Sequence, residues 1–239
     1  MAKFYTHMKE LFIFFDLGQT LINEWGFIDY FDQRFLELLN GYGTKIDKRN
    51  YRTVRDNVIR NRMIGSGGIN ELILEVCRLV CHSSYGRIIL KKLEPEFKEM
   101  RSRLFRLYDD TEITINTLVK SHKLGIIANQ PLDVVDLLQI YNVDKFFNIK
   151  LISSIVEKAK PCLKIFQLAL KQASYDPENC IMIGDRLDTD IFPANSLGMK
   201  TIRLTNSIFK IQEPINKYEY PTYTAARLGE IPDIIDCIS

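Results

Sequence analysis

The chain has almost no excess charge and no long hydrophobic run near its start. Its 32 Lys and Arg residues nearly balance 30 Asp and Glu residues, and the formal net charge is +2. So small a net charge would not recruit nucleic acid or an anionic membrane surface. The apolar run at 11–15 is too short to cross a bilayer, and Lys3 and Lys9 interrupt any signal-peptide core. We therefore expect a cytoplasmic protein whose partner is a small molecule.

Cysteine is scarce and irregularly spaced. The five cysteines form no disulfide pattern, and an odd number leaves at least one unpaired. Cys77, Cys81 and His82 have a spacing that could bind a metal on a helix, but a four-ligand zinc site needs a second ligand pair that the sequence does not offer. We expect reduced cysteines with a structural role in the core.

Short apolar runs that end in polar or glycine turns indicate strands buried on both faces of a parallel sheet. The predicted strands are 11–15, 124–128, 180–184 and, more weakly, 200–204 and 150–152. Helix-period segments lie at 112–122, 131–141, 161–173 and 191–197. This alternation predicts an α/β fold, a doubly wound parallel sheet of Rossmann-like type with helices on both sides.

The stretch 22–108 has a different character. Apolar residues recur there with a helical period, and no buried strand is evident. Candidate helices are 28–39, 48–62, 69–81 and 94–107, and a glycine-rich segment at 65–68 separates two of them. We therefore expect an α/β catalytic core made of 1–21 and 109–239, with 22–108 inserted as an all-helical cap domain.

Polar residues follow the predicted strands, where ligands bind in an open α/β sheet. They are Asp16, Asn129, Lys160, Asp185 and Asp190. Three converging carboxylates repel one another unless a cation compensates, and an all-oxygen ligand set favours Mg²⁺. The lysine adds a fixed positive charge, as the transfer of a phosphoryl group requires.

The ordered set of motifs resembles the haloacid dehalogenase-like (HAD) hydrolase superfamily. Residues 15–21 are similar to its first motif, Lys160 and Pro161 to its third, and 183–191 to its fourth. The match runs across both ends of the chain at the expected order and spacing. The resemblance implies a phosphatase-like member, a hydrolase acting on phosphoester bonds, with a helical cap that closes over the site and selects the substrate.

The resemblance also implies roles for individual residues. Asp16 attacks phosphorus, and water then hydrolyses the aspartyl-phosphate. Asp185, Asp16 and the backbone carbonyl of Gly18 hold Mg²⁺. Asp190 acts through a metal-bound water or orients Lys160. Lys160 and Asn129, with Gly18 beside them, bind the phosphate of a small phosphorylated metabolite.

Two positions depart from the family pattern. Gly18 stands where family phosphatases carry the Asp that protonates the leaving group and activates water, and this help is typically worth roughly 10²–10⁴-fold in rate. The loss of this Asp would slow the hydrolysis of acyl and aryl phosphates least, because these substrates have good leaving groups. Ala128 replaces a Ser or Thr, so the Asn129 amide or a backbone N–H would have to bind phosphate instead. Gln19, a cap carboxylate or His82 could take over the water-activating role.

These departures keep other functions open. A non-catalytic or very slow phosphate-binding protein would retain the metal site without turnover. A phosphonoacetaldehyde hydrolase-type enzyme would use a cap lysine, Lys45 or Lys48, to form a Schiff base. A dehalogenase-type enzyme would displace halide from carbon, although Gly18 is not the aromatic residue those relatives carry. The substrate, and the choice between a monomer and a homodimer, stay open.

The cap is also rich in arginine. Helical arginines at this spacing are typical of a solvated face, so contact with substrate is not the default interpretation. They are Arg49, Arg52, Arg55, Arg60 and Arg62.

Overall fold

A central parallel sheet organises the larger part of the molecule. The computed structural model describes residues 9–238, so the first eight residues of the expected core segment 1–21 lie outside the described part, as does Ser239. Six parallel strands follow the order β5-β4-β1-β6-β7-β8. Their bounds are β1 Phe12–Phe15, β4 Lys123–Ala128, β5 Phe147–Ile152, β6 Cys180–Gly184, β7 Lys200–Leu204 and β8 Tyr223–Ala225. The predicted parallel α/β fold is confirmed.

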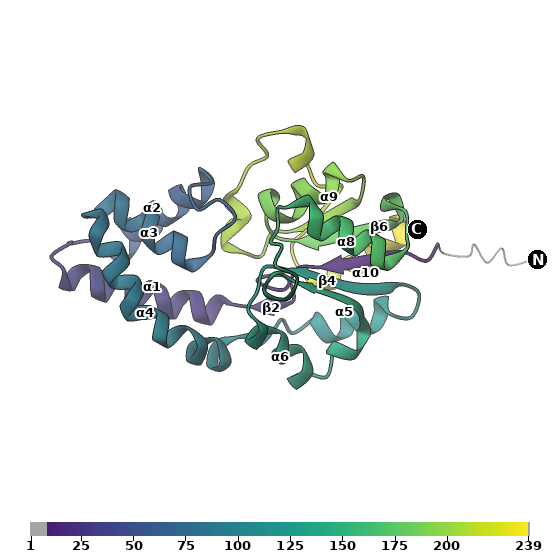
Figure 1. The fold of residues 1–239 in the computed structure, drawn as a ribbon, viewed down its shortest axis with the longest axis horizontal. Helices are drawn as coiled ribbons and strands as arrows, with labels where there is room; N and C mark the ends of the chain where they lie inside the picture. Colours follow the sequence, from purple (N-terminus) through teal and green to yellow (C-terminus); the bar gives the residue numbers. More distant parts are fainter. Residues whose placement is uncertain (1–8, 239) are drawn as a thin grey trace, which may run out of the picture.

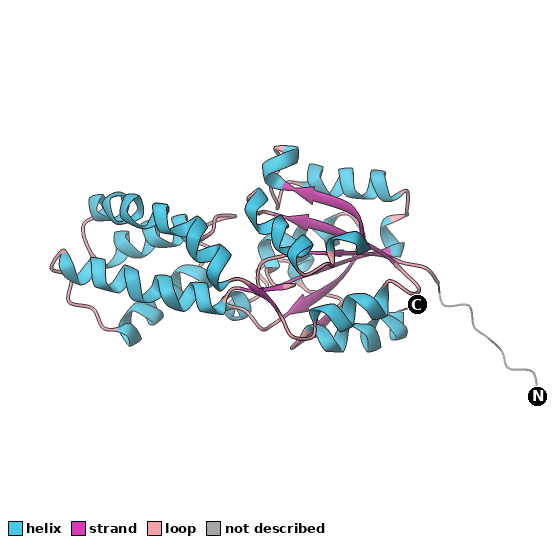
Figure 2. Ribbon diagram, turned by 90° about the horizontal axis from the view of Figure 1, so that it is seen from below, coloured by secondary structure: helices cyan, strands magenta, loops and turns pink. Residues whose placement is uncertain are grey.

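Helices cover both faces of this sheet, as Figure 2 shows. In β1 the side chains of Ile13 and Phe15 belong to one hydrophobic cluster, and those of Phe12 and Phe14 belong to the other. Both faces of the strand are therefore buried, which is why its sequence is an unbroken apolar run. The first cluster includes side chains from α5 (Thr111–Leu118), α6 (Leu132–Ile140) and α10 (Ile231–Ile238), and the second from α8 (Leu163–Ala173) and α9 (Phe192–Ser196). A short helix, α7, spans Ser153–Val156.

Four further helices stand to one side of the sheet (Figure 1). They are α1 Trp25–Gly41, α2 Lys48–Arg60, α3 Ile69–Val80 and α4 Ser83–Leu104. The chain reaches and leaves them through two short antiparallel strands, β2 Ile22–Asn23 and β3 Arg106–Leu107. We call residues 22–108 the cap region.

The last cap helix is longer at its start than the sequence predicts. The side chain of His82 accepts a hydrogen bond from the backbone N–H of Ser84 and so caps the helix there. Ile89, on the first half of the helix, is fully buried, and its burial stabilises the additional turns. Pro95 therefore lies inside the helix, although the predicted helix began at residue 94.

Aromatic side chains pack where the cap region joins the sheet. Phe27 on α1 lies 4.6 Å from Phe31 and 5.1 Å from Phe105, measured between ring centroids, and Phe31 lies 4.8 Å from Phe97 on α4. These rings belong to the same hydrophobic cluster as Phe15 of the sheet. The connection between the two parts is therefore continuous with the core.

All five cysteines are free thiols, as expected. The expectation of a core position is confirmed for Cys77, which is buried, and holds only in part for Cys81, which is half-buried. Of the remaining thiols, Cys180 is buried and Cys162 and Cys237 are exposed. Both exposed thiols lie at the margin of a helix, Cys162 just before α8 and Cys237 near the end of α10. Among residues 9–238, no helix combines the length and the apolar character needed to cross a membrane.

Candidate active site

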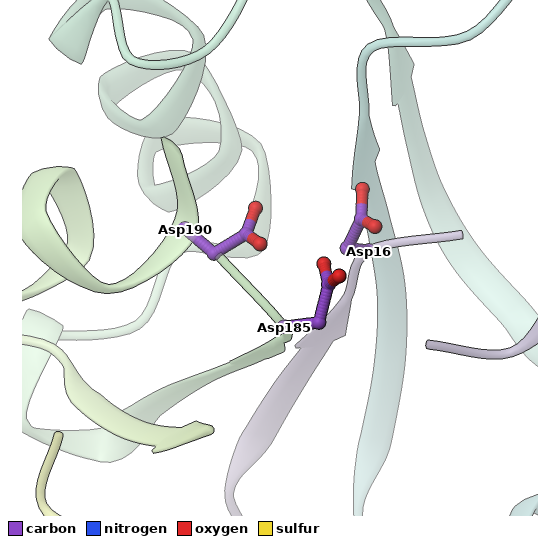
Figure 3. Close-up of side chains that lie close together, drawn as sticks. All are labelled: Asp16, Asp185 and Asp190. Carbon is purple, nitrogen blue, oxygen red and sulfur yellow. The ribbon is translucent and has the colours of Figure 1, made fainter. Parts of the chain in front are cut away.

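Three aspartates converge at the carboxyl ends of β1 and β6. Asp16 directly follows β1 and Asp185 directly follows β6, and these strands are neighbours in the sheet. Asp190 comes from the single π-helical turn Leu187–Ile191 that follows. Figure 3 shows the three carboxylates pointing toward one another, and each offers an oxygen within 4.8 Å of the others. All three are buried.

Lys160 lies between two of these carboxylates. Its Nζ donates hydrogen bonds to Oδ1 of Asp16 at 2.6 Å and to Oδ1 of Asp190 at 2.5 Å. Only 2% of the lysine side chain is exposed. The contacts with both carboxylates hold the lysine charge in one place next to Asp16.

Asn129 fixes the backbone of Lys160. Its Oδ1 accepts from the backbone N–H of Lys160, and its Nδ2 donates to the backbone carbonyl of the same residue, each at 2.8 Å. The amide of Asn129 therefore positions the lysine. Asn129 lines the same pocket as the three aspartates, so the structure brings every predicted polar site residue together.

The carboxylates carry more negative charge than Lys160 can balance. Burial raises the pKa of Asp16 to about 6, with the charge of Asp190 adding to the rise and Lys160 opposing it. Burial, followed by the charges of Asp190 and Asp16, holds the pKa of Asp185 well above its usual range. Burial lowers the pKa of Lys160, but Asp16 and Asp190 outweigh it and the net change is upward. A bound cation would relieve this imbalance.

The donor set fits a hard divalent cation. It consists of carboxylate oxygens alone, which suit Mg²⁺ better than zinc. Within residues 9–238, no other three His, Cys, Asp or Glu side chains come close enough together to hold a metal. Cys77, Cys81 and His82 therefore do not form a metal site.

Gly18 lies in the same pocket, opposite a carboxylate that sequence reasoning did not single out. A Cβ atom at position 18 would lie 2.8 Å from Oε1 of Glu24 and 2.8 Å from Nε2 of Gln130. Burial raises the pKa of Glu24 to about 8, and the charge of Asp16 adds to the rise. Residue 24 directly follows β2 and precedes α1, a place that reads from sequence only as a helix start.

The other expected replacements for the missing Asp do not supply an acid–base group. Gln19 lines the same pocket and hydrogen-bonds the side chain of Glu24. Its amide has no proton to exchange with a ligand near neutral pH, and its Oε1 accepts a hydrogen bond from the backbone N–H of Ile208. His82 caps α4 and does not line the pocket around Asp16. Ala128 is fully buried, and its methyl group offers no hydrogen bond to a ligand.

Arg186 joins the core to the cap region and was also missed from sequence. Its Nη1 donates to the carbonyl of Gly67 at 2.9 Å and its Nη2 to that of Gly65 at 2.7 Å. Asp188 holds the same guanidinium at 2.9 Å. Gly67 and Gly68 line the pocket, so Arg186 anchors the glycine-rich loop over the site.

The view of the cap arginines as one solvated face is wrong for two of them. Arg62 donates to Glu219 of the core at 2.6 Å and lies in a left-handed turn after α2. Arg55 is buried against α1, where it pairs with Asp32 at 2.6 Å. Helical spacing on α2 did not distinguish the face that packs on α1 from the face that meets solvent.

Comparison with known proteins finds relatives that are named as phosphatases and a solved structure of similar fold. The chain is 27% identical over 226 residues to a glyceraldehyde 3-phosphate phosphatase of Methanocaldococcus jannaschii, an alignment that covers 93% of this chain and 96% of the relative. It is 25% identical to the pyrophosphatase PpaX of Bacillus mycoides, over 97% of this chain and all of the relative. The magnesium-bound structure of YfnB from Bacillus subtilis, described as a HAD-hydrolase, superposes with a TM-score of 0.68 at 19% identity, over 95% of this chain and 99% of that one.

The family assignment rests on most of the chain. The sequence model of the haloacid dehalogenase-like hydrolases matches residues 13–204, a span that runs from β1 through the cap region and the three motifs named above to the end of β7. The chain belongs to the haloacid dehalogenase-like hydrolase family.

Proposed function

We propose that this chain is a Mg²⁺-dependent phosphatase that hydrolyses a small phosphorylated metabolite through an aspartyl-phosphate on Asp16. The observation that carries the proposal is the buried group of three carboxylates around one lysine at the carboxyl ends of β1 and β6. The names of the relatives, a glyceraldehyde 3-phosphate phosphatase and a pyrophosphatase, support a substrate of this class.

The residues have distinct tasks in this proposal. A carboxylate oxygen of Asp16 forms the bond to phosphorus while the bond to the leaving group breaks, and water then cleaves the aspartyl-phosphate. Lys160 neutralises the phosphoryl oxygens and holds Asp16 in place. Asp190 and Asn129 fix the lysine from its ammonium group and from its backbone.

The same carboxylates are suited to hold the metal. Asp16, Asp185 and the backbone carbonyl of Gly18 would bind Mg²⁺, and Asp190 would reach it through water. When bound, the ion supplies positive charge that offsets the charge of the phosphoryl group. The raised pKa values of Asp16 and Asp185 support this assignment, because they reflect a charge that the protein alone leaves uncompensated.

We also propose that residues 22–108 act as the substrate-selecting cap of a core made of 1–21 and 109–239. The contacts of Arg186 with the loop Gly65–Gly67 support a cap that covers the pocket. The two short strands β2 and β3 are the places where the chain crosses between the two parts.

One alternative has an observation in its favour. Gly18 and Ala128 remove an acid–base group and a hydroxyl from the pocket, which suits a non-catalytic phosphate-binding protein. The Schiff-base alternative has none, because Lys45 and Lys48 are exposed and do not line the pocket around Asp16.

The test is hydrolysis of a panel of phosphate esters and acetyl phosphate with Mg²⁺ and with EDTA. We expect turnover by the wild type with Mg²⁺, and none by Asp16→Asn or in EDTA. Asp176→Asn, a change of the same kind at an exposed position outside the pocket, should keep wild-type activity. Binding of a phosphate mimic without turnover on any substrate would favour the non-catalytic alternative.

A further inference from the structure

The side chain of Glu24 fills the space that the missing side chain at position 18 leaves open. Its Oε1 lies 2.8 Å and its Cδ lies 3.2 Å from the place where a Cβ atom of residue 18 would stand. An aspartate at position 18 would carry its carboxylate oxygens only two bonds beyond that Cβ. The Glu24 carboxylate therefore reaches nearly the same point in the pocket from another part of the chain.

The backbone around Glu24 holds it at this point. Residues 22 and 23 pair with β3, and the carbonyl of Glu24 accepts the first helical hydrogen bond of α1, from the N–H of Ile28 at 2.9 Å. Glu24 is thus fixed between a strand and a helix rather than on a free loop. Nε2 of Gln130, which follows β4, donates to Oε1 of Glu24 at 3.5 Å and limits the rotation of the carboxylate.

Glu24 also faces the reacting groups. It lines the pocket that contains Asp16, Lys160 and Asp185. On its other side it borders an apolar cavity of the cap region whose walls include Phe27 and Phe31. A leaving group that extends from the phosphoryl site toward the cap region would pass this carboxyl group.

We propose that Glu24 is the general acid and base of the reaction, in place of the Asp that the chain lacks at position 18. This inference rests on the proposed phosphatase function. As Asp16 bonds to phosphorus and the bond to the leaving oxygen breaks, the carboxyl group of Glu24 gives its proton to that oxygen. The products are the aspartyl-phosphate, a neutral alcohol and the Glu24 carboxylate.

The second half of the reaction restores both groups. The Glu24 carboxylate accepts a proton from water as the water oxygen bonds to phosphorus and the bond from phosphorus to Asp16 breaks. Inorganic phosphate leaves, and Asp16 is again a free carboxylate. An enzyme with this acid would hydrolyse alkyl phosphates, whose poor leaving groups need a proton, as well as acyl and aryl phosphates.

The first test compares leaving groups in Glu24→Gln, which keeps the size of the side chain and removes its proton chemistry. We expect kcat/KM for glycerol phosphate to fall by roughly 10²–10⁴-fold, the usual worth of general acid catalysis. For p-nitrophenyl phosphate, whose leaving group needs no proton, kcat/KM should change far less, because this ratio reports only the steps through the loss of the leaving group. Glu37→Gln, at an exposed position on α1, is the matched control and should leave kcat/KM for both substrates unchanged.

The second test moves the acid back to position 18. Gly18 does not adopt a left-handed backbone conformation. Once Glu24 is shortened, the remaining close atom is Nε2 of Gln130 at 2.8 Å, the end of a flexible side chain that can move aside for an aspartate. The double variant Glu24→Ala with Gly18→Asp should recover glycerol phosphate hydrolysis relative to Glu24→Ala alone. Thermal unfolding of each variant shows that the comparison is made between folded proteins.

The outcomes separate this proposal from the function on which it rests. If kcat/KM fell equally for both substrates in Glu24→Gln and did not recover in the double variant, Glu24 would have a structural role and the proposal would be overturned. Unchanged turnover in Glu24→Gln with turnover lost in Asp16→Asn would overturn it too, while the phosphatase function stands. Absence of turnover by the wild type on every substrate would overturn both.

Discussion

Two buried clusters of charged side chains differ in how their charges are balanced. Within the cap region, Asp32 on α1 meets two donors from α2. The hydroxyl of Tyr51 donates to one carboxylate oxygen and Nη1 of Arg55 donates to the other, both at 2.6 Å. Burial raises the pKa of Asp32, and these two partners oppose the rise. Each oxygen of this buried carboxylate has a donor.

The cluster at the edge of the sheet is built differently. Asp16, Asp185 and Asp190 are buried around the single ammonium group of Lys160. Both of the lysine contacts go to Oδ1 atoms of Asp16 and Asp190, and Asp185 lies beside them with its pKa held well above its usual range, first by burial. Here three buried carboxyl groups share one directly bonded ammonium group, and the charge of Arg186 opposes the rise in the pKa of Asp185 without cancelling it.

The contrast indicates which of the two clusters is functional. A balanced buried ion pair orients two helices and contributes to a unique packing, and its net effect on stability is small. An unbalanced one costs stability, and proteins retain such arrangements where a ligand completes them. In the proposed function a cation and a phosphoryl group complete the edge cluster, whereas the cap cluster is complete in itself.

The largest effect is expected from removing the lysine of the unbalanced cluster. Lys160→Met should lower turnover by more than about 10³-fold, because a charge next to the reacting group is lost. It should also lower the free energy of unfolding in EDTA by about 3–5 kcal/mol, because buried carboxylates lose their partner. Lys158→Met, at an exposed position nearby, is the control. If Lys160→Met had the kcat of the wild type, Lys160 would have no role in the mechanism.

The balanced cluster should affect stability alone. Arg55→Met leaves Asp32 buried without its cation and should cost about 3–5 kcal/mol in urea unfolding, with kcat of the folded protein nearly unchanged. Arg52→Met on the same helix breaks only an exposed pair with Asp29 and should cost no more than about 1 kcal/mol. A loss of kcat in Arg55→Met comparable to that in Lys160→Met would erase the distinction between the clusters.

Magnesium should stabilise the protein through the edge cluster only. At a concentration about 100 times its Kd, the ion should raise the free energy of unfolding by about 2.7 kcal/mol, measurable as a rise in Tm. Asp185→Asn should abolish this rise, and Asp176→Asn should preserve it. A rise of wild-type size in Asp185→Asn would place the bound ion somewhere else.

The smallest expected effect distinguishes the two clusters most clearly. Replacing an Asp by Asn should change the free energy of unfolding in opposite directions in the two clusters. In EDTA, Asp16→Asn relieves uncompensated charge and should raise the free energy of unfolding by on the order of 1 kcal/mol. Asp32→Asn removes the buried anion that pairs with Nη1 of Arg55, which then keeps only the more exposed Asp56 as its partner. This change should lower the free energy of unfolding. Denaturant unfolding of both variants tests this, and changes of the same sign would contradict the account.

The parts of the structure that follow from local sequence were predictable. Unbroken apolar runs mark the central strands because both faces of the sheet are covered, and the polar residue after each run marks the ligand edge. Strand β8 escaped notice because only Ala225 of its three residues is buried.

The parts that arise from packing between distant segments were not predictable. Glu24 lies outside the helix predicted at 28–39, and its place beside Gly18 arises only when β2, α1 and the end of β4 come together. Arg186 reads as a turn residue, although it binds carbonyls of a loop more than a hundred residues earlier in the chain. No pattern of spacing along the sequence carries such contacts.

The most direct measurement is the location of the phosphoryl group during turnover. Wild-type protein would be mixed with acetyl phosphate and Mg²⁺, quenched in acid within the first turnover, digested and mapped by mass spectrometry. The account predicts one phosphoryl group on the peptide that contains Asp16, and none in Asp16→Asn. Continued turnover with no phosphoryl group on that peptide, or with the group on another residue, would contradict it.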